Sequence, residues 1–115
     1  MDLSELEMLI EALGEEDVVG LLEIFLGDSM TQLEVIRGHL ASGDHHQLTR
    51  AAHTLKGSSL NMGARELADA CAQLEKSADV AEAQTLLAAV EAEAEKVREI
   101  FGGELARLRA KVAAA

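Results

Sequence analysis

The chain of 115 residues contains no proline, and this absence narrows its possible folds more than any other feature. Proline interrupts helices because it lacks a backbone N–H group and clashes with the preceding turn. A chain of this length without proline is suited to long, uninterrupted helices. Hydrophobic residues make up 49% of the sequence, which is enough for the single core that a domain of this size can bury.

Apolar residues recur at spacings of three and four along nearly the whole chain, which indicates amphipathic helices. Four breakpoints separate the segments, at residues 14–17, 42–44, 61–63 and 77–79. Helices joined by such short connections pack as antiparallel neighbours. We therefore expect an all-α fold, an antiparallel up-down-up-down four-helix bundle with a short extra N-terminal helix. Residues 1–115 would form one domain with its core at about 15–112.

Each of the four longer segments carries one stripe of residues that we expect to face the core. In chain order, the stripes are Val18, Leu22, Phe25, Ser29, Leu33, Ile36 and Leu40; Leu48, Ala52, Leu55, Ser59 and Met62; Leu67, Cys71, Leu74 and Ala78; and Ala83, Leu87, Val90, Ala94, Val97, Phe101, Leu105, Leu108 and Val112. We expect Gly43 to stop the second helix and Asp44 to be the N-cap of the next one. Gly102 and Gly103 interrupt the last segment and are expected to bend or fray it.

The charge balance excludes several classes of partner. Asp and Glu total 21 against 10 Lys and Arg, which gives a formal net charge of −11. Such an acidic surface repels nucleic acid and anionic membranes, so we expect neither as a partner. The only aromatic residues are two phenylalanines, which argues against a platform for stacking bases and against a cofactor cleft walled by rings.

The sequence carries the marks of a cytoplasmic protein. Its single cysteine, Cys71, cannot form an internal disulfide and falls in an expected core stripe. The first ten residues are acidic, unlike a signal peptide, and no apolar run approaches the roughly 18 residues of a membrane span. We therefore expect a reduced, cytoplasmic setting.

The stretch from Ala51 to Gly63 is the part of the sequence that indicates chemistry. At about 100° per residue, His53 lies about 140° from the core stripe of its helix, on the outer face. Lys56 falls at about 80° and Leu60 at about 120°, on the same side as His53. A neutral, exposed histidine is a nucleophile near pH 7.

Two neighbours of His53 strengthen this interpretation. Gly57 lies inside the predicted helix, where glycine costs about 1 kcal/mol relative to alanine. Its missing side chain would clear space for a partner one turn from the imidazole. Lys56 would place a cation beside a phosphoryl group on His53, which would carry about two negative charges.

The segment His53-Thr54-Leu55-Lys56-Gly57-Ser58-Ser59, followed by Gly63, closely resembles the histidine-containing phosphotransfer (HPt) domain. The pattern of that family is a histidine, lysine and glycine three and four positions later, small residues, and a glycine ten positions after the histidine. The flanking segments 25–28, 43–44 and 51–52 are also similar to the family. The resemblance covers roughly residues 18–97.

The resemblance implies a four-helix bundle that relays phosphoryl groups in two-component signalling. His53 would accept phosphoryl from a receiver-domain phospho-aspartate and pass it to another receiver. The implied partners are the receiver domains of response regulators and hybrid histidine kinases. The chain would have no kinase or hydrolase activity and no cofactor of its own, because the receiver supplies Mg²⁺.

A receiver must bring its aspartate pocket over His53, so we expect a partly apolar surface around this residue. Leu60 is the best candidate for it, with Thr49 at the rim. The second helix should contribute Leu26 or Met30, although helical phase leaves open which flank faces His53. Three further residues of the motif are assigned structural roles: Ser58, Ser59 and Gly63.

Two alternative interpretations compete with the phosphorelay carrier. A non-phosphorylated adaptor that binds a receiver or kinase would keep the docking surface but could lose His53 or Lys56, and both are present. A metal-binding bundle would need Glu-x-x-His pairs on facing helices, and the sequence has none, so no metal site is expected. Because the four stripes suffice to bury one core, we also expect a monomer.

Overall fold

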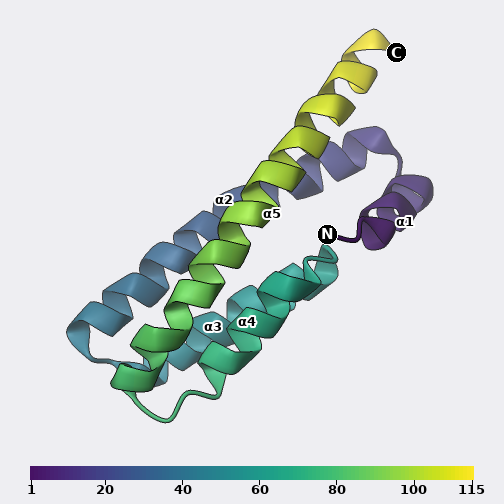
Figure 1. The fold of residues 1–115 in the computed structure, drawn as a ribbon. Coiled ribbons are helices and arrows are strands. Elements are labelled where there is room, and N and C mark those ends of the chain that lie inside the picture. The colour runs from purple at the N-terminus through teal and green to yellow at the C-terminus, as the bar shows by residue number, and fades with distance from the viewer.

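The computed structural model describes all 115 residues and consists of five α-helices. In chain order they are α1 (Ser4–Leu13), α2 (Glu15–Ser42), α3 (His45–Asn61), α4 (Arg65–Glu75) and α5 (Val80–Ala114). The long helices α2 and α5 run side by side along the molecule, α3 and α4 pack against one half of them, and α1 lies beside the other half (Figure 1). Consecutive bundle helices are antiparallel neighbours, as the short connections predicted.

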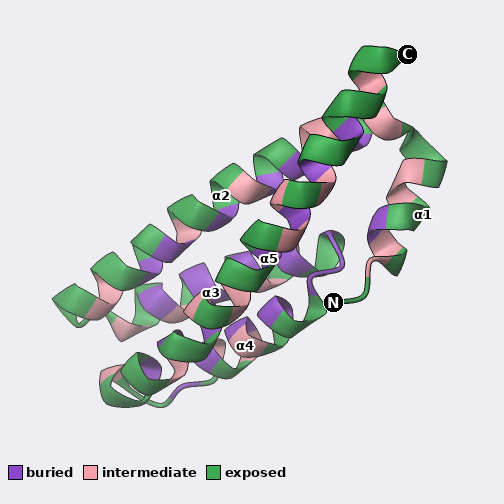
Figure 2. Ribbon diagram, turned by 45° about the horizontal axis from the view of Figure 1, so that its top comes forward, coloured by how far each residue is buried: buried purple, intermediate pink, exposed green.

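The core lies where the four bundle helices face one another, as Figure 2 shows by the inward position of the buried residues. Nearly all expected core positions are buried, and the two phenylalanines, Phe25 and Phe101, meet edge to face with ring centres 5.8 Å apart. Leu40, Ala94 and Val112 are half-buried at the margins. Each helix therefore buries its apolar stripe within one chain.

Two expectations about the later helices were wrong. Ala78 is exposed, because α4 ends at Glu75 and Ala78 lies in the connection to α5. The helix α5 continues unbroken through Gly102 and Gly103. Phe101 and Leu105 are buried on either side of this pair, and their packing against the core holds the backbone helical despite the low helix propensity of glycine.

The junction between α2 and α3 is built as the sequence predicted. Gly43 has a φ of +75°, the left-handed conformation that glycine adopts readily after a helix. Asp44 caps α3, because its carboxylate accepts a hydrogen bond of 3.1 Å from the backbone N–H of Gln47. This tight turn sets α3 directly beside α2.

Helix α1 covers the turn that joins α3 to α4. Its Leu6 is buried, and its Glu5 pairs with Arg65 at the start of α4, with 3.1 Å between Glu5 Oε1 and Arg65 Nε. Gly63 in the turn has a φ of +75°, and a Cβ atom there would lie 2.6 Å from the Cβ of Glu5. Glycine is therefore required at this position both by backbone conformation and by contact with α1.

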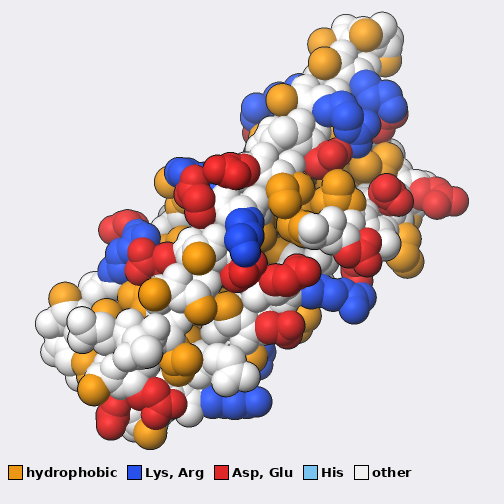
Figure 3. Space-filling view, viewed as in Figure 1, with side chains coloured by type: hydrophobic (Ala, Val, Ile, Leu, Met, Phe, Trp, Pro, Cys, Tyr) orange, Lys and Arg blue, Asp and Glu red, His pale blue; other side chains and the backbone are white.

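Acidic and basic side chains are interspersed over the face formed by α4 and α5, with lysine and arginine gathered toward the C-terminal end of α5 (Figure 3). Three of these basic residues pair with glutamates: Arg107 with Glu104, Arg109 with Glu23 and Lys111 with Glu15. No helix combines the length and the apolar character that crossing a membrane requires.

Substitution of Gly63 by alanine should destabilise the fold. Alanine would pay about 1–2 kcal/mol for the left-handed conformation and would also press against Glu5. Gly57→Ala is the matched control, because a Cβ there meets no atom within 4 Å and the helix should gain up to about 1 kcal/mol. Urea unfolding measures both changes. A Gly63→Ala protein as stable as the wild type would contradict the docking of α1 on this turn.

Candidate functional site

His53 lies on the outer face of α3, as its angle from the core stripe predicted. Its side chain is 67% exposed, whereas Leu48, Ala52, Leu55 and Ser59 of the same helix are buried. The imidazole is therefore held on a rigid helix, and a second protein can reach it.

One carboxylate connects His53 to Lys56. Glu75, the last residue of α4, places Oε1 2.6 Å from Nδ1 of His53 and Oε2 2.7 Å from Nζ of Lys56. The side chains of Glu75 and Lys56 are each 27% exposed, so this contact is partly shielded from water. The two motif residues on α3 are thus joined through a third residue on α4.

The packing of α4 explains why Glu75 reaches this position. Leu67, Cys71 and Leu74 form the buried stripe of α4, and Glu75 follows this stripe directly, at its edge. Burial raises the pKa of the Cys71 thiol to about 12, so Cys71 stays protonated and acts as an apolar core residue. With the stripe packed inward, the carboxylate lies along the surface toward α3.

The contact with Glu75 selects one form of the imidazole. A carboxylate accepts hydrogen bonds, so Glu75 favours the form of His53 that carries its proton on Nδ1. In a neutral ring the lone pair is then on Nε2, and no protein group bonds to Nε2. A similar use of a carboxylate to fix the tautomer is common behind histidines that bind metals or transfer protons.

The charges of this network favour an ionised Glu75. The hydrogen bond from Lys56 lowers the pKa of Glu75 below its ordinary value, and the hydrogen bond from His53 lowers it further. The ammonium of Lys56 is consequently engaged with a carboxylate through one hydrogen bond.

The small residues after Lys56 differ in their surroundings. Gly57 is exposed, and the space above it is open. Ser59 is buried, as its place in the core stripe predicted, and it donates a hydrogen bond of 2.7 Å to the carbonyl of Leu55. Ser58 also bonds to its own helix, with its hydroxyl 3.1 Å from the carbonyl of Leu55, and contacts neither His53 nor Lys56.

A shallow hollow adjoins His53 between α2 and α3. His53, Glu75 and Thr49 line it, and its other walls come from both helices: Gln32, Val35 and His39 from α2, and Gln47, Arg50, Ala51 and Thr54 from α3. Thr49 therefore lies beside His53, as expected. Arg50 is exposed and forms no ion pair.

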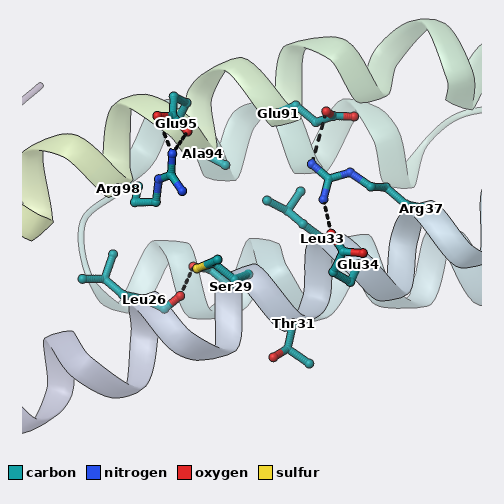
Figure 4. Close-up of a pocket in the computed structure, with 11 residues that line it drawn as sticks. Leu26, Ser29, Thr31, Leu33, Glu34, Arg37, Glu91, Ala94, Glu95 and Arg98 are labelled. Carbon is teal, nitrogen blue, oxygen red and sulfur yellow. Dashed lines mark hydrogen bonds and ion pairs between the residues drawn. The ribbon is translucent and has the colours of Figure 1, made fainter.

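The two residues expected from α2 lie on the wrong flank of that helix. Leu26 and Met30 line a groove between α2 and α5, together with Ala94 and the pairs Arg37–Glu91 and Arg98–Glu95 (Figure 4). They follow one side of the α2 core stripe, whereas Gln32, Val35 and His39 follow the other side. The groove contains no residue of the α3 motif. Leu60, in contrast, lies two turns from His53 on α3 and is 53% exposed.

Glu75 is the main residue that the sequence analysis missed. Its signal lay in the turn at Gly63, because His53 lies ten residues before this glycine and Glu75 lies twelve residues after it. Antiparallel helices that meet at a tight turn bring such positions opposite each other. Glu75 also borders the core stripe of α4, and this position was a second signal that could have identified it.

No cluster of three or more His, Cys, Asp and Glu side chains is arranged to hold a metal ion. His45 and His46 both lie at the start of α3, where His45 bonds to Ser77 and His46 is exposed.

Comparisons with known proteins agree with this geometry. Residues 20–100 match the family model of the Hpt domain. Among solved structures, the chain is similar to histidine-containing phosphotransfer protein B (HptB) from Pseudomonas aeruginosa PAO1, with a TM-score of 0.85 and 35% sequence identity. The match covers 93% of this chain and 95% of that one. A comparison with curated protein sequences gave no significant match.

The family model covers most of the chain and includes the whole α3 motif with Glu75. The chain therefore belongs to the Hpt domain family of histidine phosphotransfer proteins.

Proposed function

We propose that Nε2 of His53 is the atom through which this phosphorelay intermediate accepts and releases phosphoryl groups. The observation that carries the proposal is the contact of 2.6 Å between Nδ1 of His53 and Glu75. It occupies one ring nitrogen and leaves the other free on an exposed face. An adaptor that is never phosphorylated would not require a ring nitrogen kept free in this way.

The transfer follows from this arrangement. The lone pair of Nε2 attacks the phosphorus of a receiver phospho-aspartate, the N–P bond forms, and the P–O bond to the aspartate breaks. The aspartate leaves with the electron pair as a carboxylate. The imidazole, which keeps its proton on Nδ1, becomes positively charged as the bond forms, and the adjacent Glu75 carboxylate stabilises that charge. Reversal of these steps passes the phosphoryl group to a second receiver.

Two cations near His53, Lys56 and Arg50, differ in how they can support a phosphoryl group. Lys56 anchors Glu75 through the contact of 2.7 Å, so it can support a phosphoryl group only by sharing its ammonium protons with Glu75. Arg50 lies in the hollow beside His53 without an ion-pair partner, so its guanidinium is available to a phosphate oxygen.

The partners in this proposal are the receiver domains of response regulators and hybrid histidine kinases, with Mg²⁺ bound in the receiver. The docking surface combines Leu60 and the open space above Gly57 on α3 with Val35 of α2, which is also exposed. The chain would act as a monomer, because its helices bury their apolar stripes against one another.

Replacement of His53 by glutamine should abolish phosphoryl acceptance without unfolding the protein. The site is exposed, so stability should change by no more than about 0.5 kcal/mol. The measurement is incubation with a phosphorylated receiver, followed by a test for acid-labile, alkali-stable phosphate on the protein. His46→Gln is the control and should accept phosphate normally. Phosphate on the His53→Gln protein would place the acceptor elsewhere.

Glu75→Gln should slow the transfer step and leave receiver binding intact. The amide keeps the size of the side chain but has no charge to stabilise the imidazolium, and loss of such a supporting group typically costs about 10–100-fold. Single-turnover rates at saturating receiver measure the step. A rate equal to that of the wild type would mean that Glu75 only packs against the helix.

The same variant tests the ionisation of Glu75. Because its pKa is lowered in the folded protein, the network stabilises the fold fully above the ordinary glutamate pKa of about 4.3. That contribution disappears as the pH falls through the lowered value. Urea unfolding at several pH values should therefore show the advantage of wild type over Glu75→Gln shrinking in acid. A difference that does not depend on pH would contradict the network.

Leu60→Asp should weaken receiver binding and slow transfer from the receiver, because it places a charge in the apolar contact. Phosphorylation by a small phosphodonor should be unchanged. Met30→Asp is a closely matched control, since Met30 is 54% exposed and Leu60 53%, but Met30 lies in the groove beside α5. Equal losses of binding affinity in both variants would rule out a docking surface centred on α3.

A further inference from the structure

Glu75 is the last residue of α4, so the hydrogen bonds that hold the C-terminal turn of this helix affect the position of its carboxylate. No residue with positive φ stops the helix there; instead, the N–H of Lys76 lies 3.2 Å from the carbonyls of both Ala72 and Gln73. The hydroxyl of Ser77 donates a hydrogen bond of 2.7 Å to the carbonyl of Leu74. The same carbonyl also accepts a bond of 3.1 Å from the backbone N–H of Ser77, so the hydroxyl adds a second bond to the last turn. The last turn of a helix frays easily, and this added bond helps to keep Glu75 in a formed turn.

A histidine of α3 holds this hydroxyl in place. Nε2 of His45 lies 2.9 Å from Oγ of Ser77, which is buried. Since the hydroxyl proton points to Leu74, Oγ accepts this second bond and Nε2 of His45 is its donor. A side-chain link therefore joins the first residue of α3 to the residue that closes α4.

This link and the Glu75 network both connect α3 to the C-terminal end of α4, the first through Ser77 just after the helix and the second through its last residue. His45 and His53 are eight residues apart on α3, about 12 Å along the helix axis. Ser77 and Glu75 are only two residues apart in the chain. Two residues of α3 therefore hold Glu75 in place: His53 through a direct contact, and His45 through Ser77.

We propose that His45 is a positioning residue for the transfer at His53: through Ser77 it holds the end of α4, and so keeps the Glu75 carboxylate on Nδ1 of His53. This inference rests on the proposed function of His53. Without the link, the final turn of α4 opens more often, and Glu75, a flexible side chain, spends less time on the imidazole. The share of His53 with its proton on Nδ1 then falls, and with it the share that can attack through Nε2.

The adjacent histidine provides the matched control. His46 is exposed, and its side chain makes no hydrogen bond. His45→Ala and His46→Ala therefore remove the same side chain from neighbouring positions, and only the first removes a contact with Ser77, just after α4.

The first readout is the tautomer of His53 in the unphosphorylated protein, from the ¹⁵N chemical shifts of its ring in labelled samples. Wild type and His46→Ala should show predominantly the form with the proton on Nδ1. His45→Ala and Ser77→Ala should shift toward the other form, and the double variant should shift no further, because both changes break one link. His45→Gln, which keeps an N–H donor, should restore part of the wild-type signal.

The second readout is the rate at which phosphoramidate, a small donor, phosphorylates His53. It should fall by about 3- to 10-fold in His45→Ala, less than for direct loss of a supporting carboxylate. An unchanged tautomer and rate in the folded Ser77→Ala and His45→Ala proteins would overturn the proposal. So would equal effects of His45→Ala and His46→Ala.

The tautomer measurement requires no phosphorylation, so it separates this inference from the proposed function. A wild-type protein that accepts no phosphate on His53 would refute the function, while the shifts would still decide whether His45 positions Glu75.

Discussion

The carboxylate of Glu75 has two partners, one for each oxygen, and the chemistry of the site depends on this pair of contacts. One oxygen receives Nζ of Lys56 and the other meets Nδ1 of His53. Lys56 keeps the carboxylate ionised and in place, and the ionised carboxylate keeps a proton on Nδ1. An exposed imidazole would otherwise exchange between two tautomers, only one of which has its lone pair on the nitrogen that faces a partner. The lysine of the motif therefore acts on the histidine through a residue of another helix.

The bundle makes this pair of contacts possible by fixing α3 and α4 as a rigid hairpin. Buried stripes on both helices set their register, Gly63 allows the tight turn between them, and α1 packs over that turn. The outer face of α3 then carries positions that the core does not use. Gly57 makes this visible, because nothing in the fold requires a glycine there and its helix propensity is poor. Such a residue is explained by what must approach the surface.

Helical periodicity was sufficient to predict the five helices, most of the core and the exposure of His53. The angle from the core stripe tells inward from outward for a single helix, and His53 lay far enough round for the answer to be clear. It does not tell which side of that helix meets which neighbour. Leu26 and Met30 were misplaced for this reason, since the order of helices around the bundle decides which flank of α2 faces α3. Glu75 was not predicted, because its partners lie on a different helix and the periodicity of one helix does not identify contacts with another. Helical periodicity also failed to predict where helices end. Packing decided that α4 stops before Ala78 and that α5 continues through Gly102 and Gly103.

In the proposed mechanism, Glu75 directs the phosphoryl group to Nε2 of His53. The most direct test is to phosphorylate ¹⁵N-histidine-labelled protein from a receiver and to identify the phosphorylated ring nitrogen by its ³¹P–¹⁵N coupling. We expect a single phosphohistidine at residue 53 with phosphorus on Nε2 and a proton on Nδ1. Phosphorus on Nδ1, or on any other histidine, would contradict it.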